Sequence, residues 1–328
     1  PAVDAEMRAV VQDAEEDRGY LFGMLRYHLG WMDATFEQCA AHSGKRVRPV
    51  LCLMCCATSG AAWQKALPAA AAIELLHNFS LIHDDIEDED ETRRGRPTLW
   101  SIWGAAQGIN AGDTLFAVSQ LAILRLQEKG IRASTAVEAA RLFNETCVSL
   151  TIGQHLDIEF ENRNDVIVED YLVMIEGKTA ALVSCSCEMG ALIGGADASQ
   201  RECLRAFGRH LGLGFQMLDD VLGIWGNSAI TGKPVGADIA RRKKTLPLLH
   251  GLEQSPELRV LMSQDTLSNA DVQHARRLLE GIGSREYAEQ LAEYHHEAAL
   301  GALEQADVHQ PAAEALRELA GELLNRRR

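Results

Sequence analysis

Proline, strand-forming stretches and positive charge are all scarce in this chain of 328 residues. No proline stands between Pro97 and Pro234, which leaves room for several long, uninterrupted helices. The net charge is −15 at pH 7, which argues against a nucleic acid or an anionic membrane as the main partner. An anionic ligand would therefore need local basic groups or metal ions to hold it.

Long apolar runs are missing as well. No run approaches the roughly 20 residues that span a bilayer, and the first residues lack the pattern of a signal peptide. We therefore expect no transmembrane segment and a cytoplasmic location.

The cysteines lack the spacing of a metal site. Cys52 and Cys55 form a C-x-x-C pair, but no second pair follows at zinc-finger spacing. Most of the eight cysteines stand in apolar segments such as VLCLMCCATSG and LVSCSCEMG. This placement indicates reduced cysteines in the core.

Helix signals dominate what is present. The stretch SPEL at 255–258 is typical of a helix cap followed by proline at the first helical position. VIVEDYLVMI could form a strand locally, but it runs into the helical EGKTAALVSCSCEMGAL. WGNSAITGKPVGAD is the one conspicuous long loop, and no repeat or linker divides the chain. These patterns predict an all-α protein with a single domain over 1–328.

The stretch LIHDDIEDEDETRRGRPT at 81–98 sets a dense block of carboxylates directly before arginines. On a helix, one face within about 60° includes His77, Leu81, Asp84 and Asp88. Asp84 and Asp88 are four residues apart, so their Cβ atoms would be about 5–6 Å apart. Their repulsion would be relieved by Mg²⁺, which prefers oxygen ligands and shares sites with phosphates. The alternative is a solvated, frayed helix end.

A second acidic pair favours the metal interpretation. In GFQMLDDVLGIWG, one helix face carries Gln216, Asp219, Asp220 and Gly223. Aspartate pairs inside apolar helical segments are costly unless something neutralises them. Two such pairs suggest helices that face each other across a cavity.

Basic residues stand beside these motifs. They are Lys45, Arg46 and Arg48 in SGKRVRP, Arg93, Arg94 and Arg96 in RRGRP, Lys178 in EGKTAAL, and Lys233 and Lys243 in TGKPVGADIARRKKTLP. Arginine is suited to bidentate capture of phosphate. Such cations beside paired carboxylates and Mg²⁺ would suit a diphosphate.

Taken in order, these motifs resemble those of the trans-isoprenyl diphosphate synthases, the polyprenyl synthetase family. They are G-K-R-x-R-P (44–49), E-x-x-H (74–77), D-D-x-x-D (84–88), R-R-G-x-P-T (93–98), G-D (112–113), G-Q-x-x-D (153–157), K-T (178–179), F-Q-x-x-D-D (215–220), G-K (232–233) and D-I-x-x-x-K (238–243). Together they cover about 200 residues of the chain. Gly223 departs from the family, since many members have a third aspartate there, and we expect weaker metal binding near Asp219.

The resemblance implies a fold, a reaction and an assembly. The fold would consist of long helices around a deep central cavity, and the protein would be a homodimer. An allylic diphosphate (dimethylallyl, geranyl or farnesyl) ionises, isopentenyl diphosphate attacks the cation, and proton loss gives a longer trans product. Metals and cations stabilise the departing diphosphate, and a closed cavity excludes water.

The resemblance also implies a role for each motif residue. Mg²⁺ would be held by Asp84, Asp88 and Asp219, supported by Asp85 and Asp220. The allylic diphosphate would bind Arg93, Lys178 and Lys233, with Lys243 as a further substrate-binding residue. Isopentenyl diphosphate would bind Lys45, Arg48, His77 and Arg94. Gln216 and Thr179 would face the cationic carbon.

Product length is expected to depend on residues one turn before Asp84, since an isoprene unit is about as long as a helical turn, ~5.4 Å. Ser80 is small and lies on the side of Asp84. Phe79 lies about 140° away on the wheel, in an apolar stripe with Leu75, Ile82 and Ile86 that should pack inward. In the family, an aromatic followed by a small residue often accompanies C20 products, so we favour geranylgeranyl diphosphate, with farnesyl diphosphate as the alternative.

Other interpretations make different demands. A class I terpene cyclase also ionises allylic diphosphates, but it has no use for the isopentenyl diphosphate motifs GKRVRP and RRGRPT. A non-catalytic subunit of a heteromeric synthase would have lost an aspartate motif or the binding lysines. A plain helical scaffold would leave the aspartate pairs unexplained.

Overall fold

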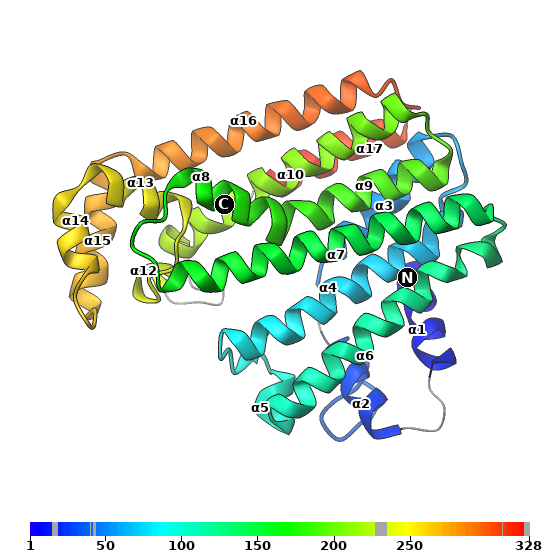
Figure 1. Ribbon diagram of the computed structural model, residues 1–328, viewed down its shortest axis with the longest axis horizontal. Helices are drawn as coiled ribbons and strands as arrows, with labels where there is room; N and C mark the ends of the chain where they lie inside the picture. Colours follow the sequence, from blue (N-terminus) through cyan, green and yellow to red (C-terminus); the bar gives the residue numbers. More distant parts are fainter. Residues whose placement is uncertain (15–18, 40, 42–43, 227–234, 310, 325–328) are drawn as a thin grey trace. The chain divides into compact units, whose positions relative to one another are not determined.

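The protein is helical nearly throughout in a computed structural model that describes residues 1–14, 19–39, 41, 44–226, 235–309 and 311–324 (Figure 1). The only paired strands in these ranges are β1 (Thr92–Arg93) and β2 (Arg96–Pro97), which form an antiparallel hairpin. The all-α prediction is therefore confirmed.

The helices follow the chain in long and short pieces. They are α1 (Ala2–Asp13), α2 (Gly19–His28), α3 (Val47–Thr58), α4 (Leu67–Glu87), α5 (Leu99–Trp103), α6 (Ala105–Leu124), α7 (Ala133–Glu161), α8 (Val168–Ile175), α9 (Ala181–Gly194), α10 (Ala198–Trp225), α12 (Ala237–Ala240), α13 (Leu246–Gln254), α14 (Pro256–Met262), α15 (Asn269–Gly281), α16 (Ser284–Gln305) and α17 (Ala312–Leu324). Short 3-10 helices η1 (Trp63–Ala66) and η2 (Arg125–Lys129) and the π-helix η3 (Glu176–Ala180) connect some of them. The long helices α6, α7 and α10 lie in the proline-free region.

Contacts divide the chain into two compact units. Unit 1 comprises Pro1–Glu145, Cys185–Arg201 and Val308–Ala313, and unit 2 comprises Thr146–Ser184, Glu202–Asp307 and Glu314–Arg328. A single domain over 1–328 stays a prediction. The first aspartate motif belongs to unit 1 and the second to unit 2.

Helix α4 is the central element of unit 1. Its first half is buried on all sides, with Ala69–Ala72, Ile73, Leu75 and Leu76 fully covered. It packs along α6, as Figure 1 shows, and also against α3 and α1. The predicted apolar stripe faces inward, because Leu75 and Ile82 are buried and Ile86 packs close to Gly108 of α6. A helix so thoroughly buried is a rigid base for the aspartates at its C-terminal end.

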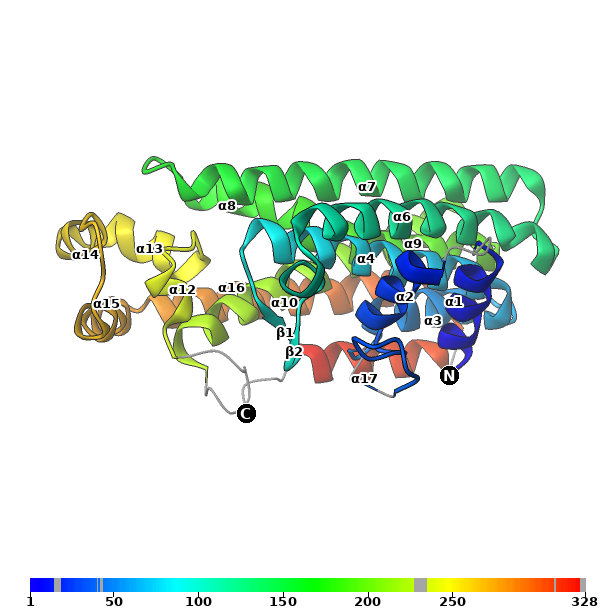
Figure 2. The same cartoon turned by 90° about the horizontal axis from the view of Figure 1, so that it is seen from below.

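Unit 2 has a second apolar cluster. It contains Ile224, Ile239, Leu248, Leu258, Leu261, Val272, Ala275 and Leu279, which come from α10 and α12–α15. Figure 2 shows α14 and α15, which both contribute to this cluster, next to one another. α14 begins where the sequence predicts, with Ser255 Oγ accepting the amide of Leu258 at 3.1 Å.

Three further sequence features concern the cysteines, the segment VIVEDYLVMI and membrane-spanning helices. Six of the eight cysteines are buried, as expected of core residues. VIVEDYLVMI is helical from Val168 onward, so its possible strand is not formed. A search of the described ranges finds no helix with the length and apolarity needed to cross a membrane.

Candidate active site

The carboxylates of unit 1 lie at the end of α4. The helix ends at Glu87, and its capping residue Asp88 donates its amide to the carbonyl of Asp84 at 2.9 Å. The stretch is therefore a helix end, yet Asp84 and Asp88 are still one turn apart. The C-terminal end of a helix carries partial negative charge, so acidic side chains there are unfavourable without a cation.

Arg93 supplies one positive charge to this end. Its Nε donates to Asp85 Oδ1 at 2.5 Å, and its Nη2 lies 3.4 Å from Asp84 Oδ2. The hairpin places it there: Arg94 and Gly95 form the turn with φ of 54° and 74°, typical of a two-residue hairpin turn. Asp85 is buried, whereas the Asp84 side chain keeps 21% exposure.

Burial governs the charge of Asp85. Desolvation raises the pKa of this carboxyl to about 6, although the guanidinium of Arg93 acts in the opposite direction. Its Oδ2 atom is buried, with no hydrogen-bond partner within the part of the chain that the structure describes. Asp85 is thus committed to Arg93, which leaves Asp84 as the carboxylate of this pair that a ligand can reach.

A group of basic side chains lies around His77, two turns before Asp84 on α4. Arg48 Nη1 is 3.4 Å from His77 Nε2, and the Arg94 guanidinium lies against Gly44. Burial, followed by Arg48, Arg94 and Arg93, lowers the pKa of His77 well below its usual value. Arg48, His77 and Arg94 therefore come together as predicted, and burial and the guanidiniums keep the histidine neutral. Lys45 precedes them in an exposed position.

His28 belongs to the same group and was missed from the sequence. Burial, followed by Arg93, Arg94 and Arg96, lowers its pKa to about 3. A lone histidine in α2 carries no signal of this placement. Arg46, by contrast, is held by Glu74 at 2.8 Å and Asp4 at 2.7 Å, so this motif arginine and glutamate stabilise one another.

The two residues predicted to set product length occupy different surroundings. The Phe79 ring packs against Phe116 of α6, with ring centroids 5.3 Å apart, and against His83 at 4.9 Å. Phe79 therefore packs against α6, in agreement with the core position that the helical wheel indicates. Ser80 is half-buried, and its Oγ donates to the carbonyl of His77 at 2.8 Å.

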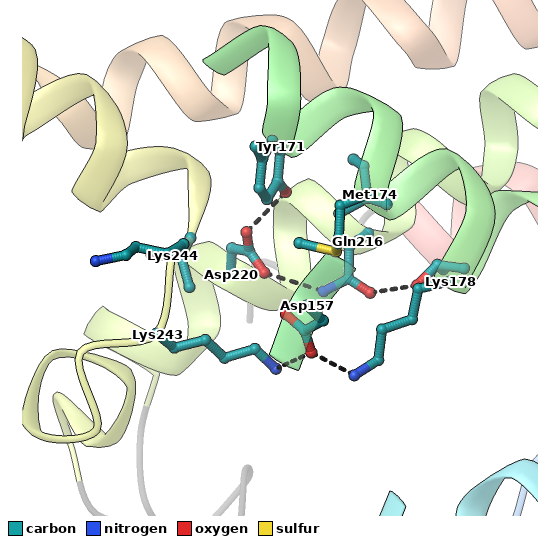
Figure 3. A pocket seen from close by; sticks show the side chains of 11 residues that line it. Asp157, Tyr171, Met174, Lys178, Gln216, Asp220, Lys243 and Lys244 are labelled. Atoms are coloured by element: carbon teal, nitrogen blue, oxygen red, sulfur yellow. Dashed lines mark hydrogen bonds and ion pairs between the residues drawn. The ribbon is translucent and has the colours of Figure 1, made fainter. Parts of the chain in front are cut away.

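In unit 2, Asp220 is surrounded by donors (Figure 3). Tyr171 donates to its Oδ2 at 2.7 Å, the Leu246 amide to the same atom at 3.1 Å, and Gln216 Nε2 to its Oδ1 at 3.0 Å. Burial raises the pKa of Asp220 to about 6, while these three bonds and Lys243 lower it. Asp220 is therefore a fixed, buried carboxylate, as Asp85 is in unit 1.

The amide of Gln216 is oriented from both ends. Thr179 Oγ1 donates to Gln216 Oε1 at 2.7 Å, and the Gln216 amino group bonds Asp220. Thr179 and Gln216, predicted to act together, are thus in direct contact. Sequence spacing does not predict that Tyr171 and the Leu246 amide bind the same carboxylate, Asp220, as Gln216 does.

Asp157 lies beside two lysines of unit 2, Lys178 and Lys243. Its Oδ2 lies 2.5 Å from Lys178 Nζ and 4.0 Å from Lys243 Nζ, as Figure 3 shows. Asp157 is the last residue of the G-Q-x-x-D motif, to which the sequence analysis assigns no role. The motif was the sequence signal from which a role for Asp157 could have been inferred. Tyr171 was missed as well, because nothing in VIVEDYLVMI marks it.

The position of Lys178 depends on a close approach of two backbones. A Cβ on Gly153 of α7 would lie 2.1 Å from the amide nitrogen of Lys178, and a Cβ on Gly177 would meet the Ser149 carbonyl at 2.7 Å. Lys178 and Thr179 lie in the π-helix η3, a distortion that often occurs at functional sites. Two glycines thus allow α7 to bring Asp157 beside η3.

Asp219 precedes Gly223 by one turn of α10 and is half-buried. The carboxylate of Asp238 from α12 covers Gly223, since a Cβ there would lie 1.9 Å from Asp238 Oδ2. An aspartate side chain at 223 would therefore need Asp238 to move. Lys233 lies outside the described residues.

The donor set fits a magnesium ion that is completed by its substrate. Within each described unit, no three histidine, cysteine or acidic side chains gather as a metal cage. Mg²⁺ usually takes one or two carboxylates and fills its other positions with water and phosphate oxygens. Asp84 and Asp88, and separately Asp219, offer carboxylates of that kind.

Comparison with known proteins is consistent with this geometry. Residues 30–279 match the family model described as polyprenyl synthetase. A geranylgeranyl diphosphate synthase of Mycobacterium tuberculosis is 42% identical over 310 residues, 93% of this chain and 87% of the relative. A (2E,6E)-farnesyl diphosphate synthase of Mycobacterium bovis is 41% identical over 280 residues, 83% and 77% of the two chains.

A solved structure extends the likeness to the fold. It is a geranylgeranyl pyrophosphate synthase of Corynebacterium glutamicum complexed with isoprenyl diphosphate and magnesium. Its TM-score is 0.85 at 27% identity, and the match covers 99% of this chain and 98% of the other. The chain belongs to the polyprenyl synthetase family and is a prenyltransferase of the short-chain trans-isoprenyl diphosphate synthase type.

Proposed function

We propose that this enzyme performs Mg²⁺-dependent condensation of isopentenyl diphosphate with allylic diphosphates and that its product is geranylgeranyl diphosphate. One observation carries the proposal: in both aspartate pairs the second carboxylate is buried and bonded, while the first keeps access to solvent. Such a pair offers one carboxylate for a metal and holds the other as a support. The magnesium in the Corynebacterium relative agrees with this choice of ion.

Each predicted residue has a place in the proposed mechanism. Asp84, Asp88 and Asp219 would hold Mg²⁺, which when bound offsets the charge of the departing diphosphate. Arg93, Lys178, Lys233 and Lys243 bind the allylic diphosphate, and Asp157 keeps Lys178 in position. Lys45, Arg48, His77 and Arg94 bind isopentenyl diphosphate without a metal. Thr179 and Gln216 present their oxygen dipoles to the cationic carbon.

The neutral state of His77 suits the proposed isopentenyl diphosphate site. Burial, and then the neighbouring guanidiniums, lower its pKa, so the imidazole can donate one hydrogen bond to a phosphate without adding charge. A diphosphate bound there would compensate Arg48 and Arg94. The terpene cyclase alternative has no use for this site, and the non-catalytic subunit has no use for intact aspartate pairs.

Product length rests on two features. A geranylgeranyl diphosphate synthase is 42% identical to this chain. The first aspartate motif, D-D-x-x-D, also lacks the two extra residues that C15 members of the family with an aromatic at the position of Phe79 usually carry there. A farnesyl diphosphate synthase is almost as similar, so C15 is the second candidate. Ser80 would let a growing chain pass beside α4, and Phe79 would limit it from the side of α6.

We also propose that the enzyme is a homodimer. The outer face of α6 is apolar and uncovered, with Ile109, Leu121 and Leu124 between 46% and 54% exposed. A second copy packed on this face would remove the apolar surface from water. Light scattering coupled to gel filtration should give twice the mass of one chain, and Leu121→Glu should lower it.

The central experiment is a product analysis. Purified enzyme is incubated with isopentenyl diphosphate, Mg²⁺ and each of the C5, C10 and C15 allylic starters, and the dephosphorylated products are sized. The proposal expects a C20 product from all three. A C15 end product would support the alternative length, and allylic diphosphate consumed without isopentenyl diphosphate would support a cyclase.

A further inference from the structure

Unit 2 also contains a hollow that is lined neither by Asp157 nor by Asp219 and Asp220. It is a cleft of about 810 Å³, within the range of small-molecule sites. Its walls come from the end of α7, the start of α8, residues 242–244, α13, α14 and α16. Leu252 and Met262 give part of it an apolar surface above the buried Leu248 and Leu249, and this part is continuous with the apolar cluster around α13.

Lys244 stands in the wall of this cleft. Its side chain points away from Asp157 and Lys243, as Figure 3 shows. It is half-buried and makes no hydrogen bond or ion pair with the residues that the structure describes. Burial, and then the charge of Arg242, lower its pKa, and no carboxylate acts against them. A half-buried ammonium of this kind gains stability from an anionic partner.

Four acidic residues line the cleft as well: Glu161, Asp165, Glu169 and Glu253. Asp165 receives two hydrogen bonds from Arg163, at 2.9 and 3.1 Å. Glu169 and Glu253 lie near Tyr287. Burial is the main cause that raises the pKa of Tyr287, and the charges of these two carboxylates raise it further. Glu161 is exposed. The cleft is thus cationic at Lys244 and Arg242 and acidic around Tyr287.

We propose that this cleft is a second binding site, for an anionic amphiphile. A phosphate or carboxylate head binds Lys244 and Arg242, and a hydrocarbon chain lies along Leu252 and Met262. Arg242 already donates one N–H to the Gln264 carbonyl, which steadies its guanidinium and leaves further donors for the head group. Prenyl phosphates and fatty acids both have this chemistry.

Calorimetric titration of the full chain in EDTA tests the proposal, because EDTA removes metal-dependent binding at the aspartates. The probes are geranylgeranyl monophosphate, palmitate and, as the uncharged control, geranylgeraniol. We expect at least one anionic probe to bind, and Lys244→Gln to weaken it about tenfold, as loss of one charge-assisted contact does. Met262→Glu should weaken it as strongly, and Asp219→Asn should leave it unchanged.

The two anionic probes also distinguish the two ligand classes. Tighter binding of geranylgeranyl monophosphate indicates a prenyl phosphate, and tighter binding of palmitate indicates a fatty acid. Circular dichroism of each variant shows that the fold is kept. The proposal is overturned if neither anionic probe binds, if geranylgeraniol binds as tightly, or if Asp219→Asn weakens binding while Lys244→Gln and Met262→Glu do not. Prenyl transfer is measured separately, so its failure would be distinguishable.

Discussion

At the scale of single residues, each aspartate pair has one accessible carboxylate, proposed to bind the metal, and one buried carboxylate that is hydrogen-bonded to its neighbours. Asp84→Ala should lower kcat by several orders of magnitude, because the metal would lose a ligand while the Asp85–Arg93 pair that shapes the helix end remains. Steady-state turnover at saturating Mg²⁺ measures this. Glu91→Ala is the matched control, since it removes an exposed carboxylate of the same acidic run. Near-normal turnover of Asp84→Ala would falsify the assignment.

A second residue-scale prediction concerns the support of Asp220. Tyr171→Phe removes one of the three donors to this buried carboxylate, so the free energy of unfolding should fall by about 1–3 kcal/mol. Turnover should fall as well, because Asp220 orients Gln216. Urea denaturation and initial rates give both quantities. Tyr294→Phe, at an exposed position of the same unit, should change neither; equal losses in the two variants would contradict this role.

At the scale of helices, close backbone contact decides where the lysines lie. Gly153→Ala would place a methyl group 2.1 Å from the Lys178 amide nitrogen, so α7 and η3 must move apart. We expect a loss of about 1–3 kcal/mol in stability and a raised KM for the allylic substrate, since Asp157 would no longer hold Lys178. Gly301→Ala is the control: nothing lies within 4 Å of its Cβ, and alanine favours a helix.

The face of α4 gives a second prediction at this scale. Ser80→Phe adds a ring one turn before Asp84, and the main product should shorten by at least one C5 unit. Phe79→Ala opens space against Phe116 instead, and should lengthen the product only if the chain grows toward α6. Chromatography of the dephosphorylated products measures the product length of both variants. An unchanged distribution for Ser80→Phe would show that the chain does not pass along this helix.

At the scale of the whole molecule, stability should depend on pH through buried histidines. Burial, then His210 and Arg209, lower the pKa of His295 to about 4. The unfolded chain binds this proton near pH 6.5 and the folded one only near 4, so the stability present above pH 6.5 is lost as pH falls toward 4. Asp85 and Asp220, with pKa values raised to about 6, act in the opposite direction.

A comparison of variants isolates the histidine. His295→Asn leaves the two aspartates in place, so their contribution cancels when variant and wild type are compared. Between pH 6.5 and 4.5, the wild type should lose about 1–3 kcal/mol more stability than the variant. Urea denaturation at each pH measures this. Parallel curves for the two proteins would contradict the assignment.

Contacts within one helix could be predicted from the sequence. Periodicity was enough to put Leu75 and Ile82 in the core and Asp84 one turn from Asp88, because neighbours on a helix are fixed by its geometry. Local chemistry was enough for the Ser255 cap. The order of the motifs was enough for the family.

Contacts between residues of different helices could be seen only in the tertiary structure. Tyr171 and the Leu246 amide reach Asp220 from 49 and 26 residues away, and Asp157 reaches Lys178 across 21. Asp238 covers Gly223, and Lys244 lines a cleft built from six segments of unit 2. Spacing in one chain cannot specify such contacts, because they depend on how helices cross, and crossings depend on side-chain packing along both surfaces.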